Sequence, residues 1–291
     1  MKIAITGSSG RVGGSLVDFL RSTGHEVIAL TRDEMPLHQP SLLRQAMESI
    51  DVDAWINPAA MSSPDACERD PEMSHAVNVV APAIMAEVCS RNDRYLLHFS
   101  TDYVFSGNAA GKKTEQDATE PLNVYGRHKL EGEMAIRQSA ARATVLRVSW
   151  IYGARVPAFV EQSIQRLFSG ETIHAIADKW SIPTAMPDLC QWVKMLIREQ
   201  PGAVIHGCHG GEPVSWYGIA MHLRNILNLP DAGEICSTQL ADAHHFLAKR
   251  PVNTAMDNQT LASMLCHPID DWQTAMTRVV SEQPYHKTIS P

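Results

Sequence analysis

The chain opens with Met1-Lys-Ile-Ala-Ile-Thr-Gly-Ser-Ser-Gly-Arg-Val-Gly13, and this stretch decides the fold. Residues 2–6 are the short, mostly apolar run of a buried strand. Three glycines follow at the spacing Gly7-x-x-Gly10-x-x-Gly13, and apolar residues at helical spacing continue to about residue 22. A strand, a glycine turn and a helix in this order are the context in which such a fingerprint binds a dinucleotide.

Each glycine of this turn has its own physical reason. Gly7 permits the tight turn, Gly10 lets the backbone approach the pyrophosphate, and Gly13 lets helix and strand pack closely. The helix N-terminus offers unpaired N–H groups to the phosphates. A strand–helix turn without a ligand is the alternative, but the position at the first strand favours the cofactor. We therefore predict cofactor contacts at Gly7, Ser9, Gly10, Arg11, Val12 and Gly13.

Strand and helix patterns alternate through the first half of the chain, which is typical of a parallel sheet covered by helices on both faces. We expect strands at 2–6, 26–30, 54–57, 95–100 and 144–149, and helices at 12–22, 40–49, 71–90 and 125–140. The predicted fold is α/β, a Rossmann-type doubly wound parallel sheet with a smaller C-terminal α/β substrate-binding lobe. Residues 1–154 would form the NADP-binding domain. Residues 155–291, which prolines break into shorter pieces, would form mostly the lobe, with some segments returning to the sheet.

Composition and charge narrow the function classes. The net charge of −7 argues against a nucleic-acid partner, and no apolar run approaches the roughly 20 residues that span a bilayer. The first residues lack the features of a signal peptide, so a cytoplasmic location is expected. The six cysteines are dispersed, and His206, His209, His244 and His245 match no common metal spacing, so no metal is expected.

The end of the second strand bears on which dinucleotide binds. An acidic residue there binds the ribose hydroxyls of NAD, whereas a basic residue accommodates the phosphate of NADP. Thr31 occupies the usual acidic place and Arg32 stands beside it, so we predict contacts from both residues and favour NADP(H). Asp33 leaves NAD(H) open if the strand ends later, and a surface salt bridge is the alternative role for Arg32.

Tyr125 and Lys129 lie four residues apart on a predicted helix and can point at one pocket. A phenol titrates at about pH 10, and a neighbouring ammonium lowers its pKa towards the working range. Thr101 ends an apolar strand, where ligands bind in such folds, and its hydroxyl can donate to a carbonyl as negative charge develops. Alone, the pair of Tyr125 and Lys129 is weak evidence for catalysis, because such spacing is frequent by chance. Thr101 could simply tie down its loop. With the glycine turn, the three residues together predict a reductase.

At these residues the chain resembles the dTDP-4-dehydrorhamnose reductase family of extended short-chain dehydrogenases/reductases. The most specific stretches are Ser100-Thr-Asp-Tyr-Val-Phe-Ser-Gly107 and Pro121-Leu-Asn-Val-Tyr-Gly-Arg-His-Lys-Leu-Glu-Gly-Glu133, and the resemblance covers nearly the entire chain. It implies NADPH-dependent reduction of a 4-keto group on a nucleotide-linked 6-deoxy sugar. Thr101 would polarise the carbonyl, Tyr125 would donate the proton, and Lys129 would support it.

The resemblance also implies residue roles around this centre. Ala59, Ala60 and Met61 would lie beside the cofactor, together with Tyr125 and Lys129. Further cofactor contact is expected at Asn78, and substrate contacts at Thr101, Asp102, Tyr103, Trp150 and Arg250. Arginine can bond a diphosphate bidentately, and a structural ion pair is the alternative for Arg250. Met61 and Pro64 depart from the family pattern and leave the sugar in doubt.

Two rival functions remain at this point. One is an NADP-binding regulatory subunit resembling the beta subunit of methionine adenosyltransferase, against which the retained Thr101, Tyr125 and Lys129 argue. The other is a sugar-nucleotide epimerase or dehydratase, which usually has an acidic residue after the second strand. A homodimer is an expectation of the family only. The nucleoside and the sugar of the substrate stay open.

Overall fold

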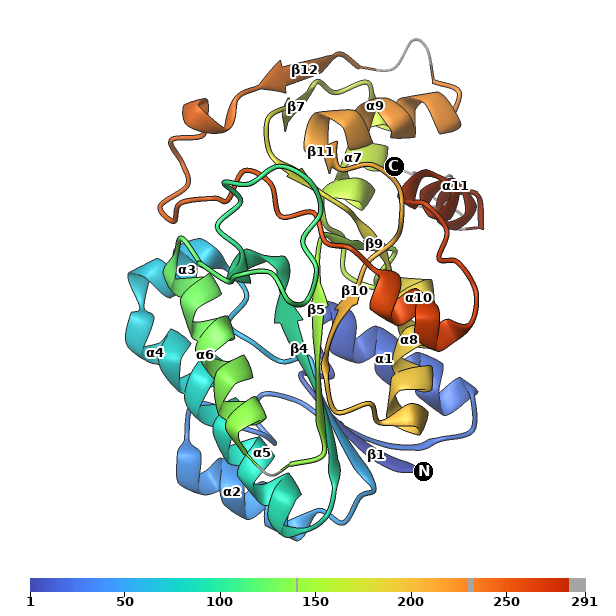
Figure 1. Cartoon of the computed structure of the whole chain (residues 1–291). Helices are drawn as coiled ribbons and strands as arrows, with labels where there is room; N and C mark the ends of the chain where they lie inside the picture. Colours follow the sequence, from blue (N-terminus) through green and yellow to red (C-terminus); the bar gives the residue numbers. More distant parts are fainter. Residues whose placement is uncertain (140, 230–232, 283–291) are drawn as a thin grey trace.

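Six parallel strands form the central sheet of the computed structural model, which describes residues 1–139, 141–229 and 233–282. The strand order is β10-β5-β4-β3-β1-β2 (Figure 1). The predicted α/β fold with a parallel sheet is therefore confirmed. The strands are β1 (Lys2–Thr6), β2 (Glu26–Leu30), β3 (Ala54–Asn57), β4 (Tyr95–Thr101), β5 (Ala143–Val148) and β10 (Val204–Gly207).

Successive side chains of these strands alternate between two hydrophobic cores, as the pleat of a strand requires. One core takes Ile3, Ile5 and Leu97 and packs them against α1 (Arg11–Ser22) and α8 (Met186–Glu199). The other takes the intervening residues, among them Trp55 and Leu96. They pack against α2 (Pro40–Ser49), α5 (Ala81–Arg91) and α6 (Val124–Gln138), which cover the opposite face (Figure 1).

The predicted helix 71–90 is wrong in its detail. It consists of α4 (Pro71–His75), a π-helical turn η1 (Ala76–Val80) and α5, and the short α3 (Pro64–Arg69) precedes it. Because a π-turn adds a residue to the helical repeat, it projects its side chains in new directions. Helix α6 lies close against this turn: a Cβ at Gly132 would lie 2.3 Å from the carbonyl oxygen of Asn78.

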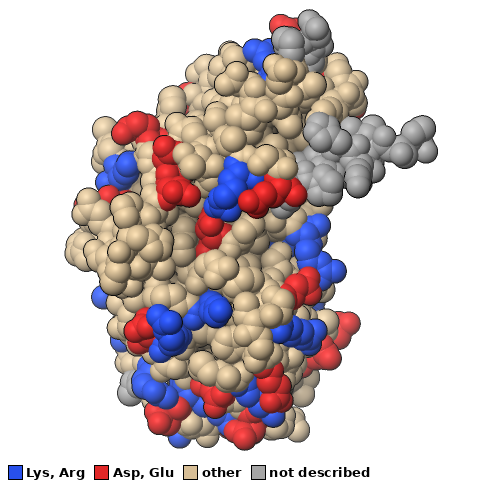
Figure 2. All heavy atoms as spheres, turned by 90° about the vertical axis from the view of Figure 1, so that its right-hand side faces the viewer, with Lys and Arg blue, Asp and Glu red and all other residues tan. Residues whose placement is uncertain are grey.

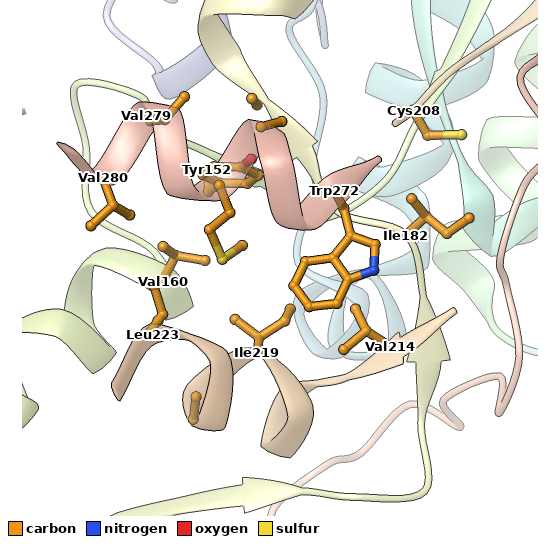
Figure 3. Packing of buried hydrophobic residues seen from close by; sticks show 14 of the residues in the cluster. Tyr152, Val160, Ile182, Cys208, Val214, Ile219, Leu223, Trp272, Val279 and Val280 are labelled. Carbon is orange, nitrogen blue, oxygen red and sulfur yellow. The ribbon is translucent and has the colours of Figure 1, made fainter. Parts of the chain in front are cut away.

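The upper part of the molecule in Figure 1 has its own hydrophobic core. Helices α7 (Phe159–Ser169), α9 (Trp216–Ile226) and α11 (Trp272–Glu282) surround it. Figure 3 shows Trp272, Ile219 and Val214 gathered there, with Val160 and Leu223 nearby. The remaining elements are β6 (Ile151–Tyr152), β7 (Ile173–Ile176), β8 (Trp180–Ser181), β9 (Thr184–Ala185), β11 (Val214–Ser215), β12 (Ile235–Thr238), α10 (Gln259–Leu265), η2 (Asp102–Val104) and η3 (Leu240–Asp242).

The second half of the chain does not stay in the upper part. Strand β10 pairs with β5 at one edge of the central sheet, and α8 packs on the sheet beside α1. The division into domains at residue 154 stays a prediction, and residues 140, 230–232 and 283–291 of the two predicted domains lie outside the described residues. Among the described helices, none combines the length and apolar character needed to cross a bilayer. Acidic and basic side chains are interspersed on the face shown in Figure 2.

Candidate active site

A cavity of about 960 Å³ lies at the carboxyl ends of the central strands, the edge where open α/β sheets bind ligands. Its wall takes residues from the glycine turn, the end of β3, the end of β4, the start of α6 and the segment after β5. All but three of the predicted site residues line it. The three that do not are Thr31, Asn78 and Arg250.

The glycine turn is as compact as its sequence predicts. Gly7 has a φ of +60°, in the region that favours glycine, and its carbonyl accepts the amide of Gly10 at 2.9 Å. A Cβ at Gly13 would lie 2.2 Å from the carbonyl oxygen of Gly7. Within the described residues no side chain caps the start of α1, so the first N–H groups of the helix lack a side-chain acceptor at the wall of the cavity.

Arg11 lines the cavity but also ties two parts of the chain together. Its Nε donates to the carbonyl of Val156 at 2.9 Å, and one terminal nitrogen donates to that of Ile151 at 2.7 Å. Burial lowers the pKa of the guanidinium, and Glu161 opposes this shift. Arg11 therefore holds the glycine turn against the segment that follows β5.

The loop after β2 presents one free cation. Thr31 donates through its amide and its hydroxyl to Glu34 at 2.9 and 2.8 Å, and it does not line the cavity. These bonds lower the pKa of Glu34. Arg32 is exposed, lines the cavity and forms no ion pair within the described part of the chain. Its guanidinium is available to a ligand.

Thr101 ends β4 beside a buried carboxylate. The Thr101 hydroxyl donates to Asp102 at 3.1 Å and accepts the amide of Tyr103 at 3.2 Å. Asp102 also accepts the hydroxyls of Ser181, at 3.1 Å, and Thr254. Burial raises the pKa of Asp102, while Lys179 and the three hydroxyls oppose the shift. Thr101 therefore does tie down its loop. Its hydroxyl hydrogen must rotate away from Asp102 before it can be donated to a carbonyl oxygen.

A glycine brings the start of α6 against this loop. Asn123 caps the helix by accepting the amide of Gly126 at 2.8 Å. A Cβ at Gly126 would lie 2.3 Å from the carbonyl oxygen of Tyr103, so only glycine allows this approach. The rings of Tyr103 and Tyr125 meet edge to face at 5.8 Å. Burial raises the pKa of Tyr125 and Thr101 opposes the shift, so the phenol keeps its proton at neutral pH.

Lys129 follows one turn later and is almost completely buried. Its Nζ donates to the carbonyl of Phe99 at 2.6 Å and lies 3.0 Å from Nε2 of His98. Burial lowers its pKa to about 8, and Glu133 on the same helix opposes the shift. Among the described residues no hydrogen bond joins Lys129 to Tyr125 directly.

Part of the cavity wall is aromatic. Trp150 has a φ of +40°, a backbone conformation that costs a bulky residue about 1–3 kcal/mol. Its ring lies 5.6 Å from that of Trp216, which stacks on Phe159 at 5.4 Å. All three line the cavity. The strained backbone therefore holds an indole in the wall of the cavity.

Sequence reasoning missed Lys179. This lysine is fully buried, and its Nζ lies 5.1 Å from the ring centroid of Tyr103 and 5.0 Å from that of Trp150. Within the described residues the Nζ has no hydrogen-bond partner. Burial lowers its pKa to about 8, and Asp102 opposes the shift. No periodicity or spacing around this position marks it, so no sequence signal could have found it.

Two predicted residues act outside the cavity wall. Asn78 lies on the π-turn, and its amide exchanges two hydrogen bonds of 3.1 Å with the backbone of Met61, which lines the cavity. Arg250 forms a bidentate ion pair with Asp65, at 2.7 and 3.0 Å, and lowers the pKa of that carboxyl to about 2. Contact between Arg250 and a substrate stays a prediction. The described residues hold no cluster of three or more metal-ligating side chains.

Comparisons with known proteins match the chain along nearly its full length. The family model described as RmlD substrate binding domain matches residues 1–284. The chain is 32% identical over 279 residues to the probable dTDP-4,6-dihydroxy-2-methyloxan-3-one 4-ketoreductase of Streptomyces antibioticus, over 95% of this chain and 93% of that protein. It is 32% identical over 284 residues to the dTDP-4-dehydrorhamnose reductase of Mycolicibacterium smegmatis, over 96% and 85%.

Solved structures agree on the fold. The dTDP-4-dehydrorhamnose reductase of Bacillus anthracis, solved in complex with NADP, matches with a TM-score of 0.89 and 22% sequence identity. The match covers 97% of this chain and 99% of that one.

Proposed function

The chain belongs to the RmlD substrate binding domain family, and we propose that it is an NADPH-dependent reductase of the 4-keto group on a nucleotide-linked 6-deoxy sugar. The predicted family membership is confirmed, and the curated relatives are named as reductases of such ketones. One observation carries the proposal: Thr101, Tyr125 and Lys129 line the same cavity as the glycine turn. A hydride source, a proton donor and a carbonyl can meet there.

The residues present fit a dinucleotide. The turn leaves no room for a Cβ at Gly13, and the uncapped start of α1 presents free N–H groups, which is the arrangement that holds a pyrophosphate. Arg32 is the free cation that would accept the additional phosphate of NADP. When bound, the dihydronicotinamide supplies the hydride. Asn78 would support this site by holding the Met61 backbone in place.

The protein groups handle the proton. Because burial raises the pKa of Tyr125, its phenol is protonated at neutral pH and can give that proton to the oxygen that becomes a hydroxyl. Thr101 would turn its hydroxyl from Asp102 to the same oxygen and stabilise the developing negative charge. Lys129 as an ammonium would stabilise the phenolate that remains. This ammonium is lost as the pH rises through about 8, so turnover should fall above that pH.

The aromatic wall of Trp150, Trp216 and Phe159 is the place proposed for the nucleotide sugar, since rings bind bases and sugar faces by stacking. Lys179 lies behind this wall and adds positive charge to it. The family expectation of a homodimer and of a cytoplasmic location belongs to the same proposal. Light scattering of the purified chain would test the first, and fractionation of cells would test the second.

The experiment is a panel of nucleotide-linked 4-keto sugars with NADPH or NADH, followed by the loss of reduced cofactor. Tyr125→Phe should lower kcat by roughly 10²–10⁴-fold and leave the Kd for NADPH unchanged, because only the proton donor is removed. Tyr95→Phe, at the far end of β4, is the matched control and should keep wild-type turnover.

Two other outcomes would overturn the proposal. Tight NADP binding without turnover of any sugar would favour the regulatory subunit. NAD that copurifies with the chain would favour an epimerase or a dehydratase.

A further inference from the structure

Behind the cavity, Lys129 continues into a chain of buried polar side chains that no step described above uses. Its Nζ lies 3.0 Å from Nε2 of His98, and Nδ1 of His98 lies 3.0 Å from the side-chain nitrogen of Asn57. The side-chain oxygen of Asn57 accepts the hydroxyl of Thr6 at 2.6 Å. His98, Asn57 and Thr6, here called the His98 chain, are completely buried on β4, β3 and β1.

The hydrogen bonds of the His98 chain determine which ring nitrogen of His98 carries the hydrogen. Thr6 donates to the oxygen of the Asn57 amide, so the NH₂ group of that amide faces His98. An NH₂ group only donates, so Nδ1 of His98 must accept and the neutral ring carries its hydrogen on Nε2. That hydrogen points at Lys129, which can accept it only as a neutral amine.

A protonated Lys129 requires the opposite order. An ammonium has no lone pair and can only donate, so Nε2 of His98 must accept and the ring must carry its hydrogen on Nδ1. Asn57 must then present its oxygen to His98 and its NH₂ group to Thr6. Rotation of the Asn57 amide by about 180° exchanges its oxygen and its NH₂ group, so the same three side chains satisfy this second arrangement and no charge is added to the ring. Burial and the Lys129 charge keep the pKa of His98 well below its usual value, so the imidazole stays neutral in both.

The His98 chain ends at Thr6, which has no exposed surface. It therefore offers protons no exit to solvent and cannot act as a conduit. Other groups near Lys129 do not replace His98. Glu133 is bound by Arg147 at 2.7 Å, and burial raises the pKa of Cys67, which keeps its thiol neutral. Tyr125 lines the same cavity as Lys129 and is itself protonated before the reaction.

We propose that His98 is a positioning residue whose tautomer changes with the protonation of Lys129, so that the ammonium has a buried acceptor while it supports Tyr125. His98 acts through Lys129 and touches neither substrate nor cofactor. The inference rests on the proposed function for the role of Lys129. The coupling itself is a property of the resting protein and can be measured without turnover.

The direct test observes the ring nitrogens of histidine by long-range ¹H–¹⁵N spectra of the wild-type protein at about pH 6.5 and about pH 9.5, on either side of the Lys129 transition. His98 should carry its hydrogen on Nδ1 at the lower pH and on Nε2 at the higher. Its signals are assigned by their loss in His98→Gln, and the change should disappear in Lys129→Met. A ring that keeps one tautomer throughout overturns the proposal.

The protein contains a matched internal control. Nδ1 of the buried His206 faces the carbonyl oxygen of Asp257 at 3.1 Å, and Nε2 faces a nitrogen of Arg147 at 3.4 Å. A carbonyl only accepts and a guanidinium only donates, so a single tautomer fits and His206 should not change.

Kinetics give the second readout. Gln can accept from the ammonium through its side-chain oxygen, whereas Leu cannot. His98→Leu should lower kcat by about tenfold, the factor that corresponds to one lost hydrogen bond to a charged group, and should move the alkaline limb of the kcat profile to lower pH. His98→Gln should restore both, with KM for the sugar unchanged. Equal profiles for the two variants would contradict the proposal. If the wild type reduces no keto sugar, the proposed function fails, and the tautomer measurement still decides this inference.

Discussion

Gly126→Ala tests how closely α6 must approach the loop that carries Thr101. The added Cβ would lie 2.3 Å from the carbonyl oxygen of Tyr103 and 2.9 Å from Cβ of Pro121, whereas ordinary contact begins at 3.4 Å. The first obstacle is backbone of η2 and the second is part of a proline ring, so neither can rotate aside and the start of the helix must move away by about 1 Å. A misplacement of about 1 Å in reacting groups costs roughly 10²-fold in rate. We expect that loss in kcat, because Tyr125 moves away from Thr101.

The same variant should remain folded. Overpacking costs about 1–3 kcal/mol, and alanine regains about 1 kcal/mol over glycine in a helix. The free energy of unfolding should therefore fall by about 0–2 kcal/mol, the difference between these two effects. Arg127→Ala changes the adjacent exposed residue of α6 and is the control.

The assay combines steady-state reduction of a keto sugar with urea unfolding and NADPH titration. Near-wild-type kcat in a folded Gly126→Ala protein would refute the reasoning, because the helix would then tolerate displacement. A loss of NADPH affinity equal to the loss of kcat would also refute it, since the damage would then extend to the cofactor site.

Two further substitutions test other parts of the cavity. Arg32→Ala should raise KM for NADPH about tenfold, the effect of a lost bond to a charged group, and leave KM for NADH unchanged; equal changes for both cofactors would exclude the phosphate contact. Burial lowers the pKa of Lys179 from its usual 10.5 to about 8, so between these values the unfolded chain holds a proton that the folded chain has lost. Wild-type unfolding free energy should therefore rise with pH across that window, by up to about 3 kcal/mol from this group, and Lys179→Met should flatten the rise measured by urea unfolding. An unchanged slope would contradict the burial of a charged lysine.

The sequence predicts the local features of this fold well, since they depend on local patterns. The predicted strands 2–6, 26–30 and 54–57 match the structure in both limits, because short apolar runs between turn residues have few alternative conformations. The π-turn at Ala76–Val80 was missed, since one inserted residue barely changes a helical pattern. Helix α3 was missed because its six residues are too few to show periodicity.

In the candidate site, too, the residues that local motifs mark could be predicted and those that long-range contacts place could not. Thr101 and Tyr125 were found through short motifs that the fold brings to one cavity. Lys179 and Arg250 could not be placed, since burial of a lysine and the choice between a ligand and Asp65 depend on contacts between distant segments. The hydrogen-bond partner of Lys129 could not be predicted for the same reason: His98 reads as one more residue of an apolar strand until α6 is packed against β4.

The pairing of β10 with β5 bears on how this protein emerges from the ribosome. The outer edge of β5 is covered by residues 204–207, which are synthesised about 55 residues after that strand ends. Until then a parallel strand rich in apolar residues has an open edge, the kind of surface that templates aggregation. The first 154 residues should therefore depend on chaperone protection during synthesis, and a fragment that stops at residue 154 should be recovered mainly in inclusion bodies.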